Sequence, residues 1–372
     1  MSNKATFETA TIADAVAKAV AVAPNKGSAL DRSGGIVIEL NINPGEPVVI
    51  RSTDLEVTYR AAVNVVELTP DPVTWRLPIG LFTKLLAQLP VTPGSQVVLS
   101  DTPKGDLLVV AGRTKAKSVM IDPSLPFPQW EAFDETPLID ADSFARRLQQ
   151  VAWATDGRTP GDPLSGVHIS GTHLVATDKK AVAFVPCTVN LPGPVTAPLH
   201  TLAVLMKNTE AVGLAATADK LLIVPGQGIQ LTSTIIKAPY PKVEMFLGDE
   251  HFTSSLTVGR DDFSQALNRM LVLAGEDRKI PAMHLTFADG QITLMMDVPD
   301  VGKVQEILDG IGGADEQKII MNPKTLKRAV DASHCAIVEL GYHKTNQRMP
   351  FRVKDEDGYF AVLSPFDPSI AN

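Results

Sequence analysis

Several features that define other classes of protein are missing from this sequence of 372 residues. Its only cysteines are Cys187 and Cys335, and two lone thiols without a C-x-x-C spacing predict a reducing compartment and no structural zinc. No stretch approaches ~18 consecutive apolar residues, so we expect no membrane span. The N-terminus lacks the charged start and apolar core of a secretory signal. These absences predict a cytoplasmic protein that does not work at a membrane.

Positive charge is in deficit, because 34 basic residues face 42 acidic ones and leave a net charge of −8. A domain that grips DNA directly is basic overall, since phosphate contacts dominate its affinity. The balance therefore argues against tight, direct DNA binding. It is compatible with a protein that gathers its positive charge on one internal surface and its negative charge outside.

A catalytic constellation is missing as well. There is no P-loop motif, and the glycine-rich run 310–313 lacks the strand-to-helix context of a dinucleotide site. His334 beside Cys335 has no partner at zinc-ligand spacing, and Asp297 and Asp300 flank a turn without further paired acids. We expect no cofactor, no metal and no enzymatic activity. The alternative is an unrecognised nuclease or hydrolase on an α+β fold.

Alternating strands and short helices make up most of the chain. Segments 35–67, 165–191 and 283–298 alternate apolar and polar residues around turns rich in Pro, Gly and Asp, as half-buried hairpins do. Six short helices are expected between such segments. They are predicted at 11–22, after Pro78, at 142–153, at 198–208, after Arg260, and from Asn322, which precedes a proline in the first helical position.

The order of helix, strands, helix and strands occurs three times, with a period of roughly 120 residues. Two internal echoes support the repeat: SLPFPQW (124–130) returns as KAPYPKV (237–243), and Thr53-Asp54 returns as Thr177-Asp178. A period this long indicates duplicated domains and not a solenoid. We therefore predict an α+β fold of three repeated domains, each with two helices packed on antiparallel sheets. The expected domains are residues 1–134, 135–249 and 250–372.

Five segments, in chain order, resemble the beta subunit of bacterial DNA polymerase III, the sliding clamp. They are residues 52–63, 112–128, 167–187, 261–276 and 359–366. The resemblance implies that two three-domain chains close head to tail into a six-domain ring around duplex DNA. Such a homodimer would be placed on DNA by a clamp loader and would tether DNA polymerase to it. A clamp-like regulator or decoy that does not close a ring is the further alternative.

Exposed basic residues are expected on all six helices, and a shared positive surface explains this set better than six unrelated solvated faces. In a ring they would line the hole and make few, sequence-blind phosphate contacts. The predicted DNA-facing residues are Lys18, Lys84, Arg146, Arg147, Lys207, Arg269, Lys324, Lys327 and Arg328.

The resemblance also implies a pocket between the second and third domains that binds short hydrophobic peptides of partner proteins. Carried over position by position, it comprises Leu148, Thr177, Lys179, Lys180, Val182, Pro241, Ile280, Asn322, Thr325, Val362, Ser364, Pro365 and Phe366. Ordinary interdomain core is the alternative for Val182 and Val362. Lys179 and Lys180 depart from the family pattern, and the chain continues as FDPSIAN after its last matching strand. These departures predict an altered peptide preference and a divergent clamp, of the kind a phage or plasmid encodes.

A ring of this type has a seam between the first domain of one chain and the third domain of the other. The predicted seam residues are Leu107, Leu108, Val109 and Val110 in a strand, and Val272 and Leu273 at a helix end. Core within each domain is the alternative for each of them.

Overall fold

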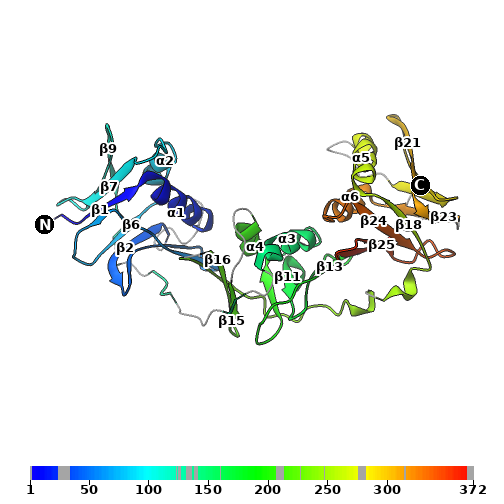
Figure 1. Ribbon diagram of the computed structural model, residues 1–372, viewed down its shortest axis with the longest axis horizontal. Coiled ribbons are helices and arrows are strands. Elements are labelled where there is room, and N and C mark those ends of the chain that lie inside the picture. Colours follow the sequence, from blue (N-terminus) through cyan, green and yellow to red (C-terminus); the bar gives the residue numbers. More distant parts are fainter. Residues whose placement is uncertain are drawn as a thin grey trace. The chain divides into compact units, whose positions relative to one another are not determined.

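The computed structural model shows helices packed on antiparallel sheets along the chain (Figure 1). By their internal contacts the residues form two compact units, the first of residues 1–141 and 203–235 and the second of residues 142–202 and 236–372. None of the described helices is long and apolar enough to cross a membrane. The structure describes residues 2–23, 34–122, 124, 127–130, 136–137, 141–159, 161–206, 213–226, 228–246, 248–274, 282–313 and 316–366.

Two helices of the first unit, α1 (Thr9–Val22) and α2 (Leu81–Leu86), lie against each other (Figure 1). Helix α1 buries Ile12, Val16 and Ala19, whose spacing of three and four residues places them on one face. The hydroxyl of Ser52 donates to the carbonyl oxygen of Ala19 at 2.7 Å and ties this helix to the sheet beneath it. Both helices lie where the hydrophobic pattern predicted them.

The first unit contains a five-stranded and an eight-stranded antiparallel sheet. In spatial order the smaller sheet is β5 (Glu67–Leu68), β1 (Lys4–Glu8), β7 (Gln96–Asp101), β8 (Asp106–Ala111) and β9 (Thr114–Val119). The larger is β10 (Thr136–Pro137), β15 (Gly213–Ala216), β16 (Lys220–Gly226), β17 (Ile229–Thr234), β4 (Val57–Ala62), β3 (Glu46–Thr53), β2 (Ile36–Asn43) and β6 (Val73–Leu77). The β4–β17 pair joins strands of the first repeat to strands of the second.

The second unit carries helices α5 (Arg260–Leu271) and α6 (Pro323–Asp331), which pack on each other (Figure 1). Asn322 caps α6, because its Oδ1 accepts from the amides of Lys324 at 2.9 Å and Thr325 at 3.2 Å. This cap, with Pro323 in the first turn, confirms the predicted helix start. The other α-helices in the described residues are α3 (Ala141–Ala152), which begins where the sequence passes from the first unit to the second, and α4 (Leu199–Met206), within which it passes back.

The second unit has a nine-stranded and a four-stranded antiparallel sheet. The larger is β14 (Val195–Pro198), β11 (Gly166–Ile169), β12 (His173–Thr177), β13 (Ala181–Pro186), β26 (Phe360–Leu363), β25 (Phe351–Lys354), β24 (Ile337–Tyr342), β18 (Ser254–Gly259) and β22 (Ile311–Gly312). The smaller is β21 (Gly302–Asp309), β20 (Gln291–Val298), β19 (Met283–Ala288) and β23 (Gln317–Met321). The β13–β26 pair joins the second repeat to the third. The two units thus divide the predicted middle domain between them, while the boundaries at 134 and 249 stay predictions.

The two Thr-Asp echoes form the same turn, one between β3 and β4 and the other between β12 and β13. The third residue of each turn has a left-handed backbone although it is not glycine, with φ of 77° at Leu55 and 72° at Lys179. Each threonine hydroxyl donates across the turn to a carbonyl oxygen, and each aspartate accepts two backbone amides. The bonds are Thr53 to Val57 (2.8 Å), Thr177 to Ala181 (2.7 Å), Glu56 and Val57 to Asp54 (2.9 and 2.6 Å), and Lys180 and Ala181 to Asp178 (2.9 and 2.8 Å). The two Thr-Asp echoes therefore share one turn structure.

This turn yields a prediction about stability. Lys179→Gly is expected to leave the free energy of unfolding unchanged or to raise it by up to about 1 kcal/mol, because glycine takes a positive φ without a Cβ clash. Asp178→Ala is expected to lower it by about 1–2 kcal/mol, because two amides lose their acceptor. Urea unfolding of both variants measures the difference. A loss of stability in Lys179→Gly as large as that in Asp178→Ala would contradict the strain argument.

Candidate functional site

An apolar cluster lies in the second unit where the strands of the second repeat meet those of the third. It consists of Val175, Val182, Val243 and Val362, which are 1–7% exposed. Val182 on β13 and Val362 on β26 are direct partners across the strand pair. The half-buried side chains that pack against the cluster are Phe184, Tyr240, Phe246, Phe252 and Phe360. Residues distant in the sequence thus form one apolar surface, which we call the junction cluster.

Aromatic stacking holds the border of the junction cluster. The rings of Phe184 and Phe360 stack at 4.7 Å between centroids, and His173 lies 4.8 Å from Phe184 on the other side. Tyr240 stacks on His168 at 4.7 Å, and burial raises the pKa of the Tyr240 hydroxyl. These contacts preorganise large apolar side chains that remain partly accessible, as a peptide-binding surface requires.

A polar rim borders the same junction. The amide of Ser364 donates to the carbonyl oxygen of Lys180 at 2.8 Å, and the amide of Phe366 donates to that of Ile320 at 2.8 Å. Residues 364–366 therefore bridge the turn before β13 and the strand that leads into α6. Lys179, Lys180 and Ser364 are exposed on this rim.

The structure brings together part of the predicted peptide pocket. Val182 and Val362 belong to the junction cluster, while Lys179, Lys180, Ser364, Pro365 and Phe366 lie on or beside its rim. Their role in binding stays a prediction.

Other predicted pocket residues have structural tasks or lie elsewhere. Leu148 is fully buried in α3, the Thr177 hydroxyl is used inside the turn, and the Asn322 side chain caps α6. Thr325 is half-buried in the first turn of that helix, and Pro241 is exposed in the segment that carries Tyr240. Ile280 lies outside the described residues.

Sequence reasoning identified Val182 and Val362 but missed the rest of the junction cluster, including Val243, Tyr240 and Phe246. The segment 237–243 was identified only as the end of a repeat. A signal was nevertheless present, because an aromatic between two prolines and an apolar pair soon afterwards is unusual for a solvated linker.

Five of the predicted DNA-facing residues have partners within the chain or lie outside the described part. Lys18 pairs with Asp14 at 2.8 Å, and Lys327 pairs with Asp331. Arg269 holds Glu306 through two hydrogen bonds of 2.6 and 3.0 Å, which lower the pKa of that carboxyl. Arg147 donates to the carbonyl oxygen of Pro186 at 2.6 Å, and Lys207 is outside the described residues. Part of the expected positive charge is therefore locally compensated.

The other four predicted residues are Lys84, Arg146, Lys324 and Arg328, and within the described part of the chain no hydrogen bond or ion pair engages their side chains. Burial, followed by the nearby charge of Arg146, lowers the pKa of His334. This histidine is therefore neutral at pH 7 and adds no positive charge beside Arg146.

The predicted seam strand lies inside its sheet. Strand β8 pairs with β7 on one side and β9 on the other, and Leu107 and Val109 are buried in the core. Leu108 and Val110 are half-buried on the opposite face. At the end of α5, Val272 is 80% exposed and Leu273 is half-buried. Because the backbone of β8 is already paired, the terminal strand of this sheet is β9.

The fold defines a class: short helices packed on antiparallel sheets match the architecture of sliding clamps over nearly the whole chain. The DNA polymerase III beta subunit of Thermotoga maritima superposes with a TM-score of 0.84 at 17% identity, covering 98% of this chain and 99% of that chain. The DnaN sliding clamp of Pseudomonas aeruginosa, with griselimycin bound, superposes with a TM-score of 0.85 at 18% identity, covering 99% of this chain and all of that chain.

Sequence comparisons identify the family. Residues 249–365 match the model of the DNA polymerase III beta subunit, C-terminal domain. The beta sliding clamp of Synechococcus elongatus is 24% identical over 310 residues, which cover 78% of each protein. Residues 249–365 thus match the DNA polymerase III beta-subunit family, and the chain as a whole is similar to beta sliding clamps. Members of this family are not enzymes. No group of three or more metal-ligating side chains lies together in the described ranges.

Proposed function

We propose that this chain is a DNA sliding clamp that encircles duplex DNA as a homodimeric ring. The observation that carries the proposal is the way its sheets are joined. Strands β4 and β13 each follow the left-handed turn described above, and each pairs with the last strand of the next three-stranded meander, β17 or β26. Strand β21 follows a similar turn, with Asp300 at φ 64°, and is the terminal strand of its sheet.

The corresponding partner of β21 would be β9, since β7, β8 and β9 form the same kind of meander and β9 ends its sheet. A pairing of β21 in one chain with β9 in another is head to tail, and it closes into a ring when the rotation allows. Exposed terminal strands also need to be covered, because their free backbone groups invite pairing. The seam we propose is therefore β21 with β9, flanked by Val272 and Leu273, and not β8.

A ring explains how a chain with a net charge of −8 works on DNA. A topological link needs only weak contacts with phosphates, and strong ones would hinder sliding. We propose that Lys84, Arg146, Lys324 and Arg328 supply most of these contacts, because the structure pairs the other described candidates with acids or a carbonyl oxygen. Such a protein acts in the cytoplasm with a clamp loader and a DNA polymerase. Its origin in a phage or plasmid stays a prediction.

The junction cluster is the proposed surface for hydrophobic peptides of partner proteins. Its support is the combination of a buried apolar centre, half-buried aromatic borders and a polar rim. The Pseudomonas aeruginosa clamp binds griselimycin. Griselimycin is therefore a suitable probe. If this chain binds it, we expect the compound to contact the junction cluster around Val182 and Val362.

The mass in solution tests the proposed function first. Light scattering along a dilution series is expected to give about twice 39.8 kDa, because each of the two seams of the ring buries two sheet edges. Loaded protein is then expected to stay on circular DNA and to leave once the DNA is cut. A strict monomer would favour the decoy alternative, and equal retention on circular and linear DNA would exclude a topological link.

A further inference from the structure

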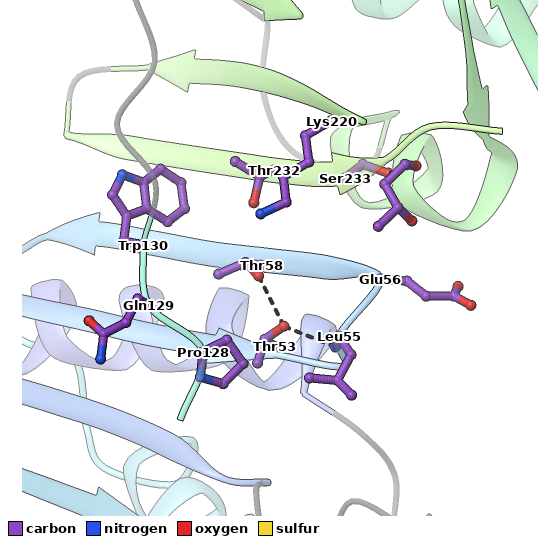
Figure 2. Close-up of a pocket in the computed structure, with 11 residues that line it drawn as sticks. Thr53, Leu55, Glu56, Thr58, Pro128, Gln129, Trp130, Lys220, Thr232 and Ser233 are labelled. Carbon is purple, nitrogen blue, oxygen red and sulfur yellow. Dashed lines mark hydrogen bonds between the residues drawn. The ribbon is translucent and has the colours of Figure 1, made fainter. Parts of the chain in front are cut away.

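A pocket in the first unit lies where β4 meets β17 (Figure 2). Thr58 and Thr232 are partners across these strands, and Leu55 and Trp130 line the pocket beside them. Figure 2 shows the Lys220 side chain directed into the pocket. The pocket has a volume of about 80 Å³. Since a cavity of ~150 Å³ holds one benzene ring, this pocket has room for one aliphatic side chain.

The pocket occupies the place in the first repeat that the junction cluster occupies in the second. Both sites follow the same Thr-Asp turn, and both lie where a strand joins the next repeat. In both, an echoed Pro-aromatic-Pro segment contributes to the site, through Pro128 and Trp130 here and through Tyr240 and Val243 there. The duplicated fold thus supplies two equivalent junctions, and the second of them has a different chemistry.

Leu55 is the unusual residue of this pocket. Its side chain is 52% exposed, and its φ of 77° lies in the left-handed region that favours glycine. A leucine in this position strains the backbone without burying its side chain inside the chain. Strain of this kind is typical of sites that present a side chain to a ligand.

The opposite wall is rigid. Trp130 packs against Ala215, Leu222 and Val224, and the guanidinium of Arg60 lies 5.7 Å from the centre of its ring. Arg60 is itself fixed by an ion pair with Glu46. The indole is therefore held in place before any ligand arrives, which lowers the entropy that binding must overcome.

The lining combines two chemistries. Leu55, Pro128 and Trp130 offer apolar walls, while the Lys220 ammonium and the Thr232 hydroxyl suit a carboxylate. The Thr58 hydroxyl is bonded to that of Thr53 at 3.0 Å. Glu56 is directed away from the pocket in Figure 2. An aliphatic side chain next to a carboxylate on an extended peptide satisfies both halves of the site.

We propose that this pocket is a second peptide-binding site, for an acidic residue followed by an aliphatic one. The pocket itself does not depend on the proposed function. Only the assumption that the peptide belongs to a clamp partner rests on it. A partner that carries one peptide for this site and another for the junction cluster would gain overall affinity from the linkage.

Fluorine NMR of protein labelled with 5-fluorotryptophan tests the proposal directly. The chain has three tryptophans, so Trp130→Phe assigns the relevant signal. The probes are acetyl-Gly-Asp-Leu-Gly-amide and its Asn-Leu counterpart. The Asp-Leu peptide is expected to shift the Trp130 signal saturably, in the millimolar range usual for so small a ligand. The Asn-Leu peptide lacks the ion pair with Lys220 and is expected to bind about threefold more weakly. The difference is small because an exposed ion pair contributes little binding free energy.

Variants separate the two halves of the site. Lys220→Gln is expected to weaken the Asp-Leu peptide about threefold and to abolish the difference between the two peptides. Lys242→Gln, an exposed lysine of the second unit, is the matched control and is expected to change nothing. Leu55→Gly is expected to weaken binding about fivefold without lowering the thermal midpoint, since glycine relieves the turn.

No Trp130 shift up to about 10 mM peptide would overturn the proposal, because such a site could not contribute usefully. Equal binding of both peptides, unaffected by Lys220→Gln, would overturn it too. The assay uses the free protein and neither DNA nor a polymerase. A negative peptide-binding result therefore does not count against the proposed ring. A monomeric mass in solution, in turn, does not count against peptide binding at this pocket.

Discussion

Lys117→Pro is expected to convert the proposed two-chain ring into monomers. Lys117 lies in β9, which is joined to β8 by the two-residue turn Gly112-Arg113, so that Ala111 and Thr114 form the closing pair. In such a hairpin the closing pair exchanges both hydrogen bonds, and every second residue from there on faces the neighbouring strand. The amide of Lys117 therefore points away from β8, toward the proposed seam. Proline removes this amide and places its ring in the path of β21 of the other chain.

The expected weakening is large. At each of the two seams a proline at this position loses a ladder hydrogen bond and adds a steric clash, together about 3 kcal/mol over the ring, or about 100-fold in the dissociation constant. Light scattering of the variant at successive dilutions is expected to show 39.8 kDa at concentrations where the parent protein is still a dimer. Lys117→Ala, which keeps the amide, is the matched control and is expected to dimerise normally.

The fold of the variant is expected to survive, because a proline whose missing amide faces outward is tolerated on an edge strand. Circular dichroism and thermal unfolding check this point. If Lys117→Pro stays dimeric at every dilution at which the parent protein does, β9 is not at the seam.

The part of the fold that could be predicted depends on local pattern. Helix positions followed from apolar residues three and four apart, and Asn322 with Pro323 identified the start of α6 before its cap was observed. The Thr-Asp echoes identified the repeat because turn chemistry is local. Strand order could not be predicted in the same way. The sequence predicted a strand at Leu107–Val110, within β8, but it did not show that β9 follows and ends the sheet.

The difference between local and long-range contacts also explains which ion pairs of the predicted DNA-facing residues could be predicted. The pairs Asp14–Lys18 and Lys327–Asp331 are spaced by four residues, so their compensation could have been inferred from the sequence. The pairing of Arg269 with Glu306 joins a helix to a strand and depends on the tertiary fold. Among the apolar residues, Val182 and Val362 were identified through the family resemblance. Val243 and Phe246 were missed because they lie in a segment without regular periodicity.

The second large effect is expected at the junction cluster, in the variant Phe246→Ala. Phe246 ends a short 3₁₀ turn, Glu244–Phe246, and packs half-buried against the four valines of the cluster. A half-buried aromatic at the border of an apolar surface is the usual anchor for a partner, and its truncation costs about 2 kcal/mol or more of binding free energy. The variant is expected to lose about 30-fold or more in affinity for partner peptides. Processive synthesis on primed circular DNA by the cognate polymerase is expected to fall close to the level without a clamp.

The ring should be unaffected, because Phe246 is in neither β9 nor β21, and light scattering of Phe246→Ala checks that the mass is that of the parent. Ile337→Ala is the matched control, since it removes an exposed apolar side chain, 54% accessible, from another strand of the same unit. Full processivity in Phe246→Ala with an intact dimer would mean that partners attach elsewhere. The pocket at Leu55 and Trp130 is then the next candidate contact, and Leu55→Gly in the same processivity assay tests it.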